Sequence, residues 1–325
     1  MMFSITHFGS VCRNNNDAYS DNDLLIICEH KYKKYYFEKF NCRGYSVSIF
    51  SERQLHNMKN KGSLFLQHLK LESQILIDVN GSFKTFLDNC DLITPTDDEI
   101  SNCKKTIEDL NRWHNDDKSI AWKADFLYTS SRDYLIKLLA RDGIFAFGLD
   151  SIIERYSEHY FINPSLFNSL RLLREIKSAY RNNTKLPKNN EIIFSINDWF
   201  EVLEREMNFI FEPQCDANFL QLKKFSSNYE RLRYLEVIYI SLVDAGYIHN
   251  NHDEIVKLIL RPNLYHSLRN LKIKTIEGYL NELYELYKLT SFQSNKMPIK
   301  SNILIRKKDI ELSDSVRNKF VLTNE

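Results

Sequence analysis

The chain has 325 residues, of which 43% are hydrophobic and 27% charged, and its formal net charge at pH 7 is +1. This length allows two domains with buried cores, and the small net charge excludes a protein that is basic throughout, so nucleic-acid binding would need a local patch. No stretch reaches the roughly 18 to 20 apolar residues of a membrane-spanning helix, and the N-terminus lacks a secretory pattern. We therefore expect a cytoplasmic protein without a membrane partner.

The cysteines and glycines set further bounds. Six cysteines, at positions 12, 28, 42, 90, 103 and 215, form no Cys-x-x-Cys pair and no cluster with zinc-binding spacing. We therefore expect free thiols. Only eight glycines occur in the whole chain, which disfavours a loop-rich β architecture and favours long helices.

Two acidic residues stand at the start of an apolar segment near the N-terminus. Residues 2–7 and 21–28 read as strands, and the second begins with Asp21 and Asp23. Positions two apart in a strand project from the same face, so these residues form a carboxylate pair. Two neighbouring carboxylates repel each other unless a divalent cation lies between them, and Mg²⁺ is the expected ion, with Mn²⁺ as the alternative.

A Gly-Ser pair follows the first strand. Gly9 allows the backbone to approach a ligand closely, and the free N–H groups of a helix that starts there would favour phosphate. Ser10 adds a hydroxyl donor. Phosphate donors on one turn and a metal-binding pair on the next strand are the groups that hold a nucleoside triphosphate with its metal.

These two motifs together resemble a known superfamily. Phe8-Gly9-Ser10 and Asp21-Asn22-Asp23-Leu24 are similar in sequence and spacing to the motif of the DNA polymerase β-like nucleotidyltransferases. Asn22 departs from the pattern, which usually has an apolar residue there. The resemblance implies that the protein transfers a nucleotide from a nucleoside triphosphate to a hydroxyl group with the help of Mg²⁺. It also implies metal ligands at Asp21 and Asp23, and nucleotide contacts at Gly9, Ser10, Arg13 and Ser20.

The remainder of the first domain alternates between short apolar segments. We expect a strand or helix at 33–40, a strand at 45–50, a helix that begins after Ser51, a helix at 64–72 and a strand at 74–79. Together with the first two strands, these elements predict a small mixed sheet with helices. The fold class is therefore α+β, with the nucleotidyltransferase domain at residues 1–94.

The strand at 74–79 carries one carboxylate, Asp78, among apolar residues. Isolating a charge in this way costs several kcal/mol unless the group is paired or bound to a metal. The resemblance implies a third acidic residue on a neighbouring strand, which helps to bind the catalytic metal and to deprotonate the acceptor hydroxyl, and Asp78 is the candidate for it. The alternative is a strand-end aspartate that bonds to a turn at Asn80-Gly81. By the same resemblance His68 and Lys70 would lie near the site, although a half-buried helical histidine is more common.

A second domain begins after Thr94-Pro95. Thr96 and Glu99 fit a capping box, and apolar residues then recur at three-and-four spacing in five segments, at 122–143, 167–176, 199–207, 232–242 and 276–287. We expect an α-helical bundle at 95–290 and a C-terminal tail at 291–325. A bundle in this position resembles the kanamycin nucleotidyltransferase and HEPN-like arrangement, in which helices supply cations to the triphosphate. Arg132 and Lys137 are the candidates, and a solvated helix face is the alternative.

Two further motifs are weaker. Arg261 and His266 match the Arg-x4-His spacing of HEPN ribonucleases, but Pro262 removes a helical N–H from a motif that normally lies within a helix. In the tail, 303–305 is apolar and 306–308 is basic, so this segment either contacts nucleic acid or is a solvated tail.

The function that these residues favour is template-independent transfer of NMP or dNMP, with the acceptor left open. An RNA 3′ end, a side chain of a partner protein and a growing oligonucleotide all remain, as in bacterial anti-phage defence or toxin-antitoxin systems. A partner protein or a homo-oligomer is compatible with each. The competing interpretation is a non-catalytic antitoxin or partner-binding module that keeps the nucleotidyltransferase fold.

Overall fold

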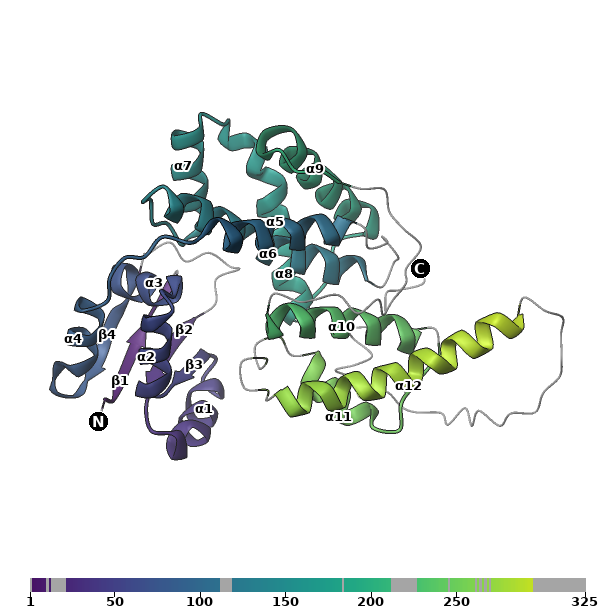
Figure 1. The fold of residues 1–325 in the computed structure, drawn as a ribbon, viewed down its shortest axis with the longest axis horizontal. Helices are drawn as coiled ribbons and strands as arrows, with labels where there is room; N and C mark the ends of the chain where they lie inside the picture. The colour runs from purple at the N-terminus through teal and green to yellow at the C-terminus, as the bar shows by residue number, and fades with distance from the viewer. Residues whose placement is uncertain are drawn as a thin grey trace. The chain divides into compact units, whose positions relative to one another are not determined.

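The computed structural model describes residues 2–9, 12, 22–111, 119–182, 184–211, 227–244, 246–260, 262, 265, 268 and 270–294. Within these ranges, the N-terminal part forms a small mixed sheet with helices and the remainder is largely helical (Figure 1). The predicted α+β class is confirmed. None of the helices in the described ranges combines the length and apolarity that a bilayer crossing requires.

The sheet has four strands in the order β3-β2-β1-β4. β1 is antiparallel to both of its neighbours, whereas β2 and β3 are parallel. All four predicted strands are present, and their bounds are β1 Ser4–His7, β2 Asp23–Ile27, β3 Ser46–Phe50 and β4 Gln74–Asp78.

Both faces of the central strands are covered. Leu25 and Ile27 of β2 belong to a core with residues of α2, α3 and α4, whereas Leu24 and Ile26 belong to a core that residues of α1 cover. Burial on both faces explains why β2 reads as a continuous apolar run rather than an alternating one. The covering helices are α1 Lys33–Asn41, α2 Glu52–Asn60, α3 Leu64–Glu72 and α4 Ser82–Asp88.

Local sequence signals fix several helix starts. Ser51 caps α2, and its side chain accepts a hydrogen bond from the backbone N of Gln54, whose own side chain accepts one from the backbone N of Ser51. The predicted capping box at Thr96 is confirmed by the same reciprocal pair with Glu99. The ambiguous segment at 33–40 is helical.

The helical region contains all five predicted helices. Its elements are α5 Asp97–Asn111, α6 Ile120–Arg141, α7 Leu149–Tyr160, α8 Asn168–Asn182, α9 Asn189–Met207, α10 Asn228–Asp244, α11 His252–Ile259 and α12 Asn270–Ser294. Among the described residues, short 3-10 helices occur at η2 His30–Tyr32, η3 Val79–Gly81 and η4 Pro164–Phe167.

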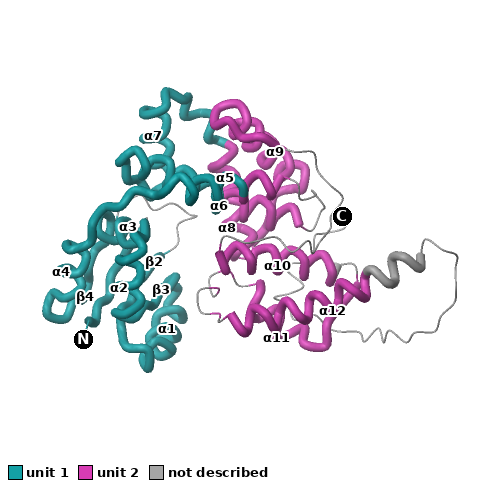
Figure 2. Tube along the Cα trace, in the orientation of Figure 1, with its two compact units in different colours: residues 1–105, 129–168 teal, residues 106–128, 169–325 magenta. Residues whose placement is uncertain are grey.

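The chain divides into two compact units, shown in Figure 2. Unit 1 comprises residues 1–105 and 129–168, and unit 2 comprises residues 106–128 and 169–325. The sheet therefore shares its unit with helical segments that we assign to the bundle from sequence. Of the expected tail, residues 291–294 continue α12, and residues 295–325 lie outside the described ranges.

Unit 2 contains an ion network whose three central side chains are fully buried. The side chains of Asp125, Arg233 and Glu236 are 0% exposed. Arg233 is 2.7 Å from the Asp125 carboxylate and 3.3 Å from that of Glu236. Arg181 donates a hydrogen bond to the other carboxylate oxygen of Asp125 at 2.9 Å. Buried charges of this kind are stable only when each one is paired.

Two tyrosines complete this network. The Tyr180 hydroxyl donates to one oxygen of Glu236 at 2.9 Å, and the Tyr265 hydroxyl lies 3.1 Å from the other and 2.5 Å from the backbone carbonyl of Ile259. Both carboxylate oxygens of Glu236 therefore have partners. Burial raises the pKa of both tyrosines well above their ordinary value, and the Glu236 charge adds to this effect, so the two hydroxyls remain donors at neutral pH.

Helix α7 ends in an unfavourable backbone conformation. Phe161, its C-cap, has φ 57° and ψ 38°, in the left-handed region, and its side chain is 94% exposed. That conformation costs a residue with a Cβ about 1–2 kcal/mol, whereas glycine adopts it freely but loses about 0.5–1 kcal/mol through its unfolded-state entropy.

We expect Phe161→Gly to raise the free energy of unfolding by about 0.5–1 kcal/mol. Urea denaturation measures this change. Asn208→Gly is the matched control, because Asn208 is the left-handed C-cap of α9 and asparagine tolerates that region, so its gain is smaller. A destabilised Phe161→Gly variant would contradict the prediction.

Candidate functional site

The structure brings Gly9 and Asp23 together at one end of the sheet. Gly9 follows β1 with φ 79°, and a Cβ added there would lie 2.8 Å from Oδ2 of Asp23. The backbone N of Phe8 donates to the carbonyl of Asp23 at 3.3 Å. The glycine turn and the first acidic strand therefore meet as the sequence motif predicts, and only glycine leaves room beside this carboxylate oxygen.

We expect Gly9→Ala to destabilise the protein by about 1–2 kcal/mol through backbone strain, plus about 0.5–1.5 kcal/mol for displacing the Asp23 side chain from its rotamer. Gly44→Ala is the matched control, because Gly44 has φ 82° and nothing within 4 Å of an added Cβ. Urea denaturation of both variants measures the difference. Equal losses would show that the Asp23 carboxylate moves without cost.

Four predicted site residues cannot be placed by the described structure. Ser10, Arg13, Ser20 and Asp21 lie outside the described residues. Asp23 is the first residue of β2 and is half-buried. Of the two motifs, Gly9 and Asp23 therefore lie within the described residues, and they lie together.

Asp78 lies at the opposite end of the sheet from Asp23. The register of β1 with β4 pairs Ser4 with Asp78, whereas the register with β2 pairs His7 with Leu24. Because Asp23 precedes Leu24, the two carboxylates are separated by about four residues of β1, or about 13 Å along the strand. This placement corrects the expectation that Asp78 completes the carboxylate pair.

The Asp78 carboxylate instead caps a helix. One oxygen accepts a hydrogen bond from the backbone N of Phe83 at 3.0 Å, and the other accepts from the backbone N of Lys84 at 2.9 Å. These donors lie in the first turn of α4, where backbone N–H groups have no helical acceptor. These two hydrogen bonds stabilise the Asp78 charge. The donors lie in α4, just after the Asn80-Gly81 turn that the sequence suggests as the partner.

Within the described residues, the other three strands carry no carboxylate at the Asp23 end of the sheet. Ser46 of β3 pairs with Asp23 in the parallel register, and Gln74 of β4 pairs with His7 at the same end of the sheet. Among β1 to β4, acidic residues occur only at Asp23 and Asp78. The described residues contain no group of three acidic, His or Cys side chains that could hold a metal ion.

Arg132 and Lys137 of α6 are both engaged within unit 1. Arg132 donates to the backbone carbonyl of Phe147 at 2.5 Å, and Lys137 lies 2.8 Å from the Asp133 carboxylate and 3.0 Å from Sγ of Cys103. Burial opposes the charge of Lys137, but Asp133 and Cys103 together raise its pKa above the usual value. Burial also raises the pKa of Cys103 to about 12, so this thiol is protonated at neutral pH.

His68 and Lys70 of α3 have different surroundings. The ring of His68 stacks on Phe147 at 4.6 Å and meets the edge of Phe8 at 5.9 Å, and its Nε2 lies 3.3 Å from the Glu72 carboxylate. Because Phe8 precedes Gly9, His68 packs directly behind the glycine turn. Lys70 donates to the backbone carbonyls of Asp88 and Cys90 at 3.1 and 2.7 Å.

The other motifs fall largely outside the described structure. Arg261 and His266 are not among the described residues, nor is any residue of 295–325. None of the motifs described above includes residues 30–43, where five Lys or Arg and five aromatic residues occur within 14 positions. Local density of cations and aromatic rings is the signal that identifies this segment.

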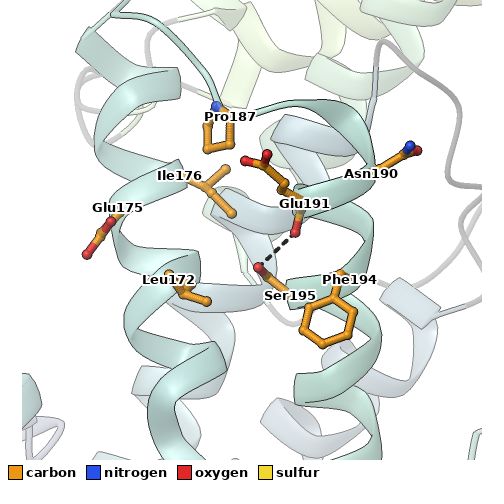
Figure 3. A pocket seen from close by; sticks show the side chains of 8 residues that line it. All are labelled: Leu172, Glu175, Ile176, Pro187, Asn190, Glu191, Phe194 and Ser195. Atoms are coloured by element: carbon orange, nitrogen blue, oxygen red, sulfur yellow. Dashed lines mark hydrogen bonds between the residues drawn. The ribbon is translucent and has the colours of Figure 1, made fainter.

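A pocket in unit 2 contains none of the predicted site residues. Leu172, Glu175 and Ile176 line it from α8, and Asn190, Glu191, Phe194 and Ser195 line it from α9, with Pro187 between them (Figure 3). The Ser195 hydroxyl donates to the backbone carbonyl of Glu191 at 2.9 Å. Its lining is largely apolar, and it presents no cation to a phosphate.

Comparison with known proteins adds no identification. No protein-family model, no curated protein and no solved structure matches this chain.

Proposed function

We propose that the protein is a metal-dependent nucleotidyltransferase whose reaction centre lies at the Gly9–Asp23 end of the sheet. The observation that carries this proposal is the 2.8 Å between the Cβ position at residue 9 and Oδ2 of Asp23. Phosphate-binding backbone and a metal-binding carboxylate have to be this close to hold the same triphosphate.

The residues at this end fit a phosphate-bound divalent cation. The missing side chain at Gly9 leaves space beside a carboxylate oxygen of the half-buried Asp23, and carboxylate oxygens are ligands that Mg²⁺ and Mn²⁺ prefer. Asp21 and Asp23 would hold the ion, and Gly9, Ser10, Arg13 and Ser20 would contact the nucleotide. Bound Mg²⁺ would supply charge neutralisation on the triphosphate.

The proposed reaction joins the acceptor to the α-phosphorus. The acceptor hydroxyl forms the new P–O bond, the bond between the α-phosphorus and the bridging oxygen breaks, and pyrophosphate leaves. Asp78 has no part in this proposal, because both of its oxygens accept backbone hydrogen bonds from α4. Arg132 and Lys137 would reach a triphosphate only by giving up their present partners, so we leave them out of the proposed site.

A second candidate is a module that binds a nucleotide or a partner protein without transferring anything. The observation in its favour is that Asp23 pairs with Ser46 of β3, and that none of β1 to β4 carries another carboxylate at that end of the sheet among the described residues. Such a module could still act as an antitoxin or a regulatory subunit, because neither role requires catalysis.

Incubation with each labelled NTP and dNTP separates the two candidates. The full-length protein is incubated with Mg²⁺ or Mn²⁺, with and without total RNA, and labelled protein, RNA and free oligonucleotides are resolved on a gel. Label in any of these products supports transfer and identifies the acceptor class. Absence of label everywhere, with nucleotide binding detected by equilibrium dialysis, supports the binding module instead.

A further inference from the structure

A row of cations and aromatic rings covers the exposed side of α1 and the turns that flank it. We call this the basic–aromatic strip, and its members are Lys31, Tyr32, Lys34, Tyr35, Lys39 and Arg43, all exposed. Tyr32 and Tyr35 are 47% and 57% exposed, which is unusual for large rings on a helix that has an apolar face of its own.

One face of α1 packs on the sheet, and the opposite face is exposed. Tyr36, Phe37 and Phe40 pack on the sheet core that contains Leu24 and Ile26, and this contact holds α1 on the sheet. Lys34, Tyr35 and Lys39 lie on the opposite side, because helical positions three and four apart share a face. The Tyr35 ring meets the edge of Tyr36 at 5.1 Å, but neither Tyr32 nor Tyr35 belongs to this core.

Within the strip, cations lie against aromatic faces. Lys31 is 4.9 Å from the centre of the Tyr32 ring, and Lys39 is 5.6 Å from that of Tyr35. Arg43 is 6.0 Å from the ring of Phe40. Lys31 and Lys34 also pair with Glu29 and Glu38 at 2.9 and 3.9 Å, but exposed ion pairs of this kind contribute little and exchange readily for another anion.

The strip leads to the end of the sheet where Asp23 lies. α1 runs back along the sheet between the parallel strands β2 and β3, and Gly44 and Tyr45 connect it to Ser46, the partner of Asp23. The Tyr45 ring is 6.0 Å from Phe40 and 5.9 Å from His7. Aromatic contacts therefore continue from the C-terminal end of the strip to β1.

We propose that the basic–aromatic strip binds single-stranded nucleic acid and presents one end of it to the Gly9–Asp23 end of the sheet as the acceptor. This inference rests on the proposed function for the acceptor role. Cations neutralise backbone phosphates, and exposed rings stack on unpaired bases without sequence preference. The single-stranded form is favoured because base stacking on a helix side needs bases that are not already paired.

The strip does not fit a membrane surface as well. Its exposed rings are tyrosines, and α1 is only nine residues long, or about 13 Å. Amphipathic helices that bind the bilayer present an aliphatic or tryptophan-rich face to the lipid, whereas α1 buries its apolar face on the sheet. Vesicle binding is therefore an outcome that the experiment has to distinguish.

The test is fluorescence anisotropy of the full-length protein with labelled single-stranded RNA and DNA 20-mers. We expect Tyr35→Ala/Lys39→Ala/Arg43→Ala to weaken binding about tenfold or more. The triple variant loses two cations, so the slope of log K against log salt concentration should also become shallower by about 1.4, at about 0.7 per phosphate contact for single strands. The matched control is Phe194→Ala/Lys185→Ala/Lys188→Ala, which removes one exposed ring and two exposed cations from unit 2. We expect it to bind as the wild type does.

Three results would overturn the proposal: no binding by the wild-type protein, equal affinity of the strip variant, or binding to phosphatidylserine vesicles in place of oligonucleotides. Circular dichroism confirms that the strip variant is folded, and the salt slope of the wild type tests the charge contacts independently of any variant.

Nucleotide transfer is measured in parallel to separate this inference from the proposed function. We expect Asp23→Asn to retain oligonucleotide affinity and to lose transfer. Oligonucleotide binding through the strip without any transfer overturns the proposed function and the acceptor role while leaving the binding surface established. If the strip variant labels protein at the wild-type rate, the strip is not the acceptor site. The proposed function is then unaffected.

Discussion

Replacing Asp23 with asparagine should reduce nucleotide transfer about a thousandfold while the protein remains folded. Asparagine keeps the size of the side chain but removes the charge that would hold Mg²⁺ on the triphosphate. A catalytic metal contributes several kcal/mol to the transition state, and each 1.36 kcal/mol corresponds to a factor of ten in rate. The measurement is the initial rate of labelled product at saturating nucleotide, in Mg²⁺ and in Mn²⁺.

The matched control for this prediction is Asp78→Asn. Asp78 is a carboxylate on the same sheet, but its oxygens cap α4, and asparagine also accepts hydrogen bonds at a helix start. We expect its transfer rate to equal that of the wild type. Loss of transfer in Asp78→Asn as large as that in Asp23→Asn would contradict the placement of the reaction at the Gly9 end. Full activity of Asp23→Asn would contradict the proposed function itself.

The second large effect concerns the buried ion network of unit 2. We expect Arg233→Met to lower the free energy of unfolding by about 3–5 kcal/mol, because the remaining charges of Asp125 and Glu236 are buried without their shared partner. Methionine fills a similar volume, so the loss reflects charge rather than a cavity. Urea denaturation of the full-length protein, followed by circular dichroism, measures the change.

Arg205→Met is the matched control for this substitution. Arg205 pairs with Glu201 and Glu206 on α9, and its side chain is 58% exposed. Exposed ion pairs contribute about 0–1 kcal/mol, so we expect a change below 1 kcal/mol. Similar losses in the two variants would show that the network is solvated or that its charges are neutral in the folded protein.

The same network predicts how stability depends on acid. Burial raises the pKa of Asp125, but the charges of Arg181 and Arg233 outweigh it and hold the pKa below its ordinary value. A carboxyl whose pKa is lower in the folded state adds stability above its unfolded pKa of about 4, and this contribution is lost as the pH falls through the folded pKa. In Arg233→Met, Asp125 keeps Arg181 but loses the charge of Arg233, so the pKa of its carboxyl in the folded protein is lowered less. The stability that Asp125 contributes should therefore be lost at a higher pH in this variant than in the wild type.

Local patterns predict the elements of this fold well because their causes are local. The capping boxes at Ser51 and Thr96 depend on residues three positions apart, and the apolar run at 24–28 follows from burial of both sheet faces. The Gly9–Asp23 contact is also predictable, since the motif joins the end of one strand to the start of its neighbour.

The position of Asp78 is not local in this sense. Whether a strand-end aspartate lies beside Asp23 depends on strand order and direction, and β4 pairs antiparallel with β1 rather than with β2. The sequence contains no signal for that choice. The small net charge likewise conceals the basic–aromatic strip, because acidic residues elsewhere in the chain cancel its cations.

Unit boundaries are also difficult to predict from sequence. Pro95 and the capping box mark where a helix begins, but that helix, α5, and the long α6 each contribute residues to both units. A helix start is visible in the sequence because its backbone N–H groups need acceptors. The tertiary contacts that decide to which unit a helix belongs leave no comparable mark.

The central place of β1 in the sheet affects how the nascent chain can fold. β1 is synthesised first and its neighbour β2 follows soon after, but its other neighbour, β4, begins only at Gln74. At the ribosomal rate of roughly 5 to 20 residues per second, one edge of β1 therefore remains unpaired for several seconds until β4 has been synthesised. Its unpaired N–H and C=O groups are a template for pairing with another chain during that time. Translation speed between β1 and β4 should thus influence the yield of native protein in the cell.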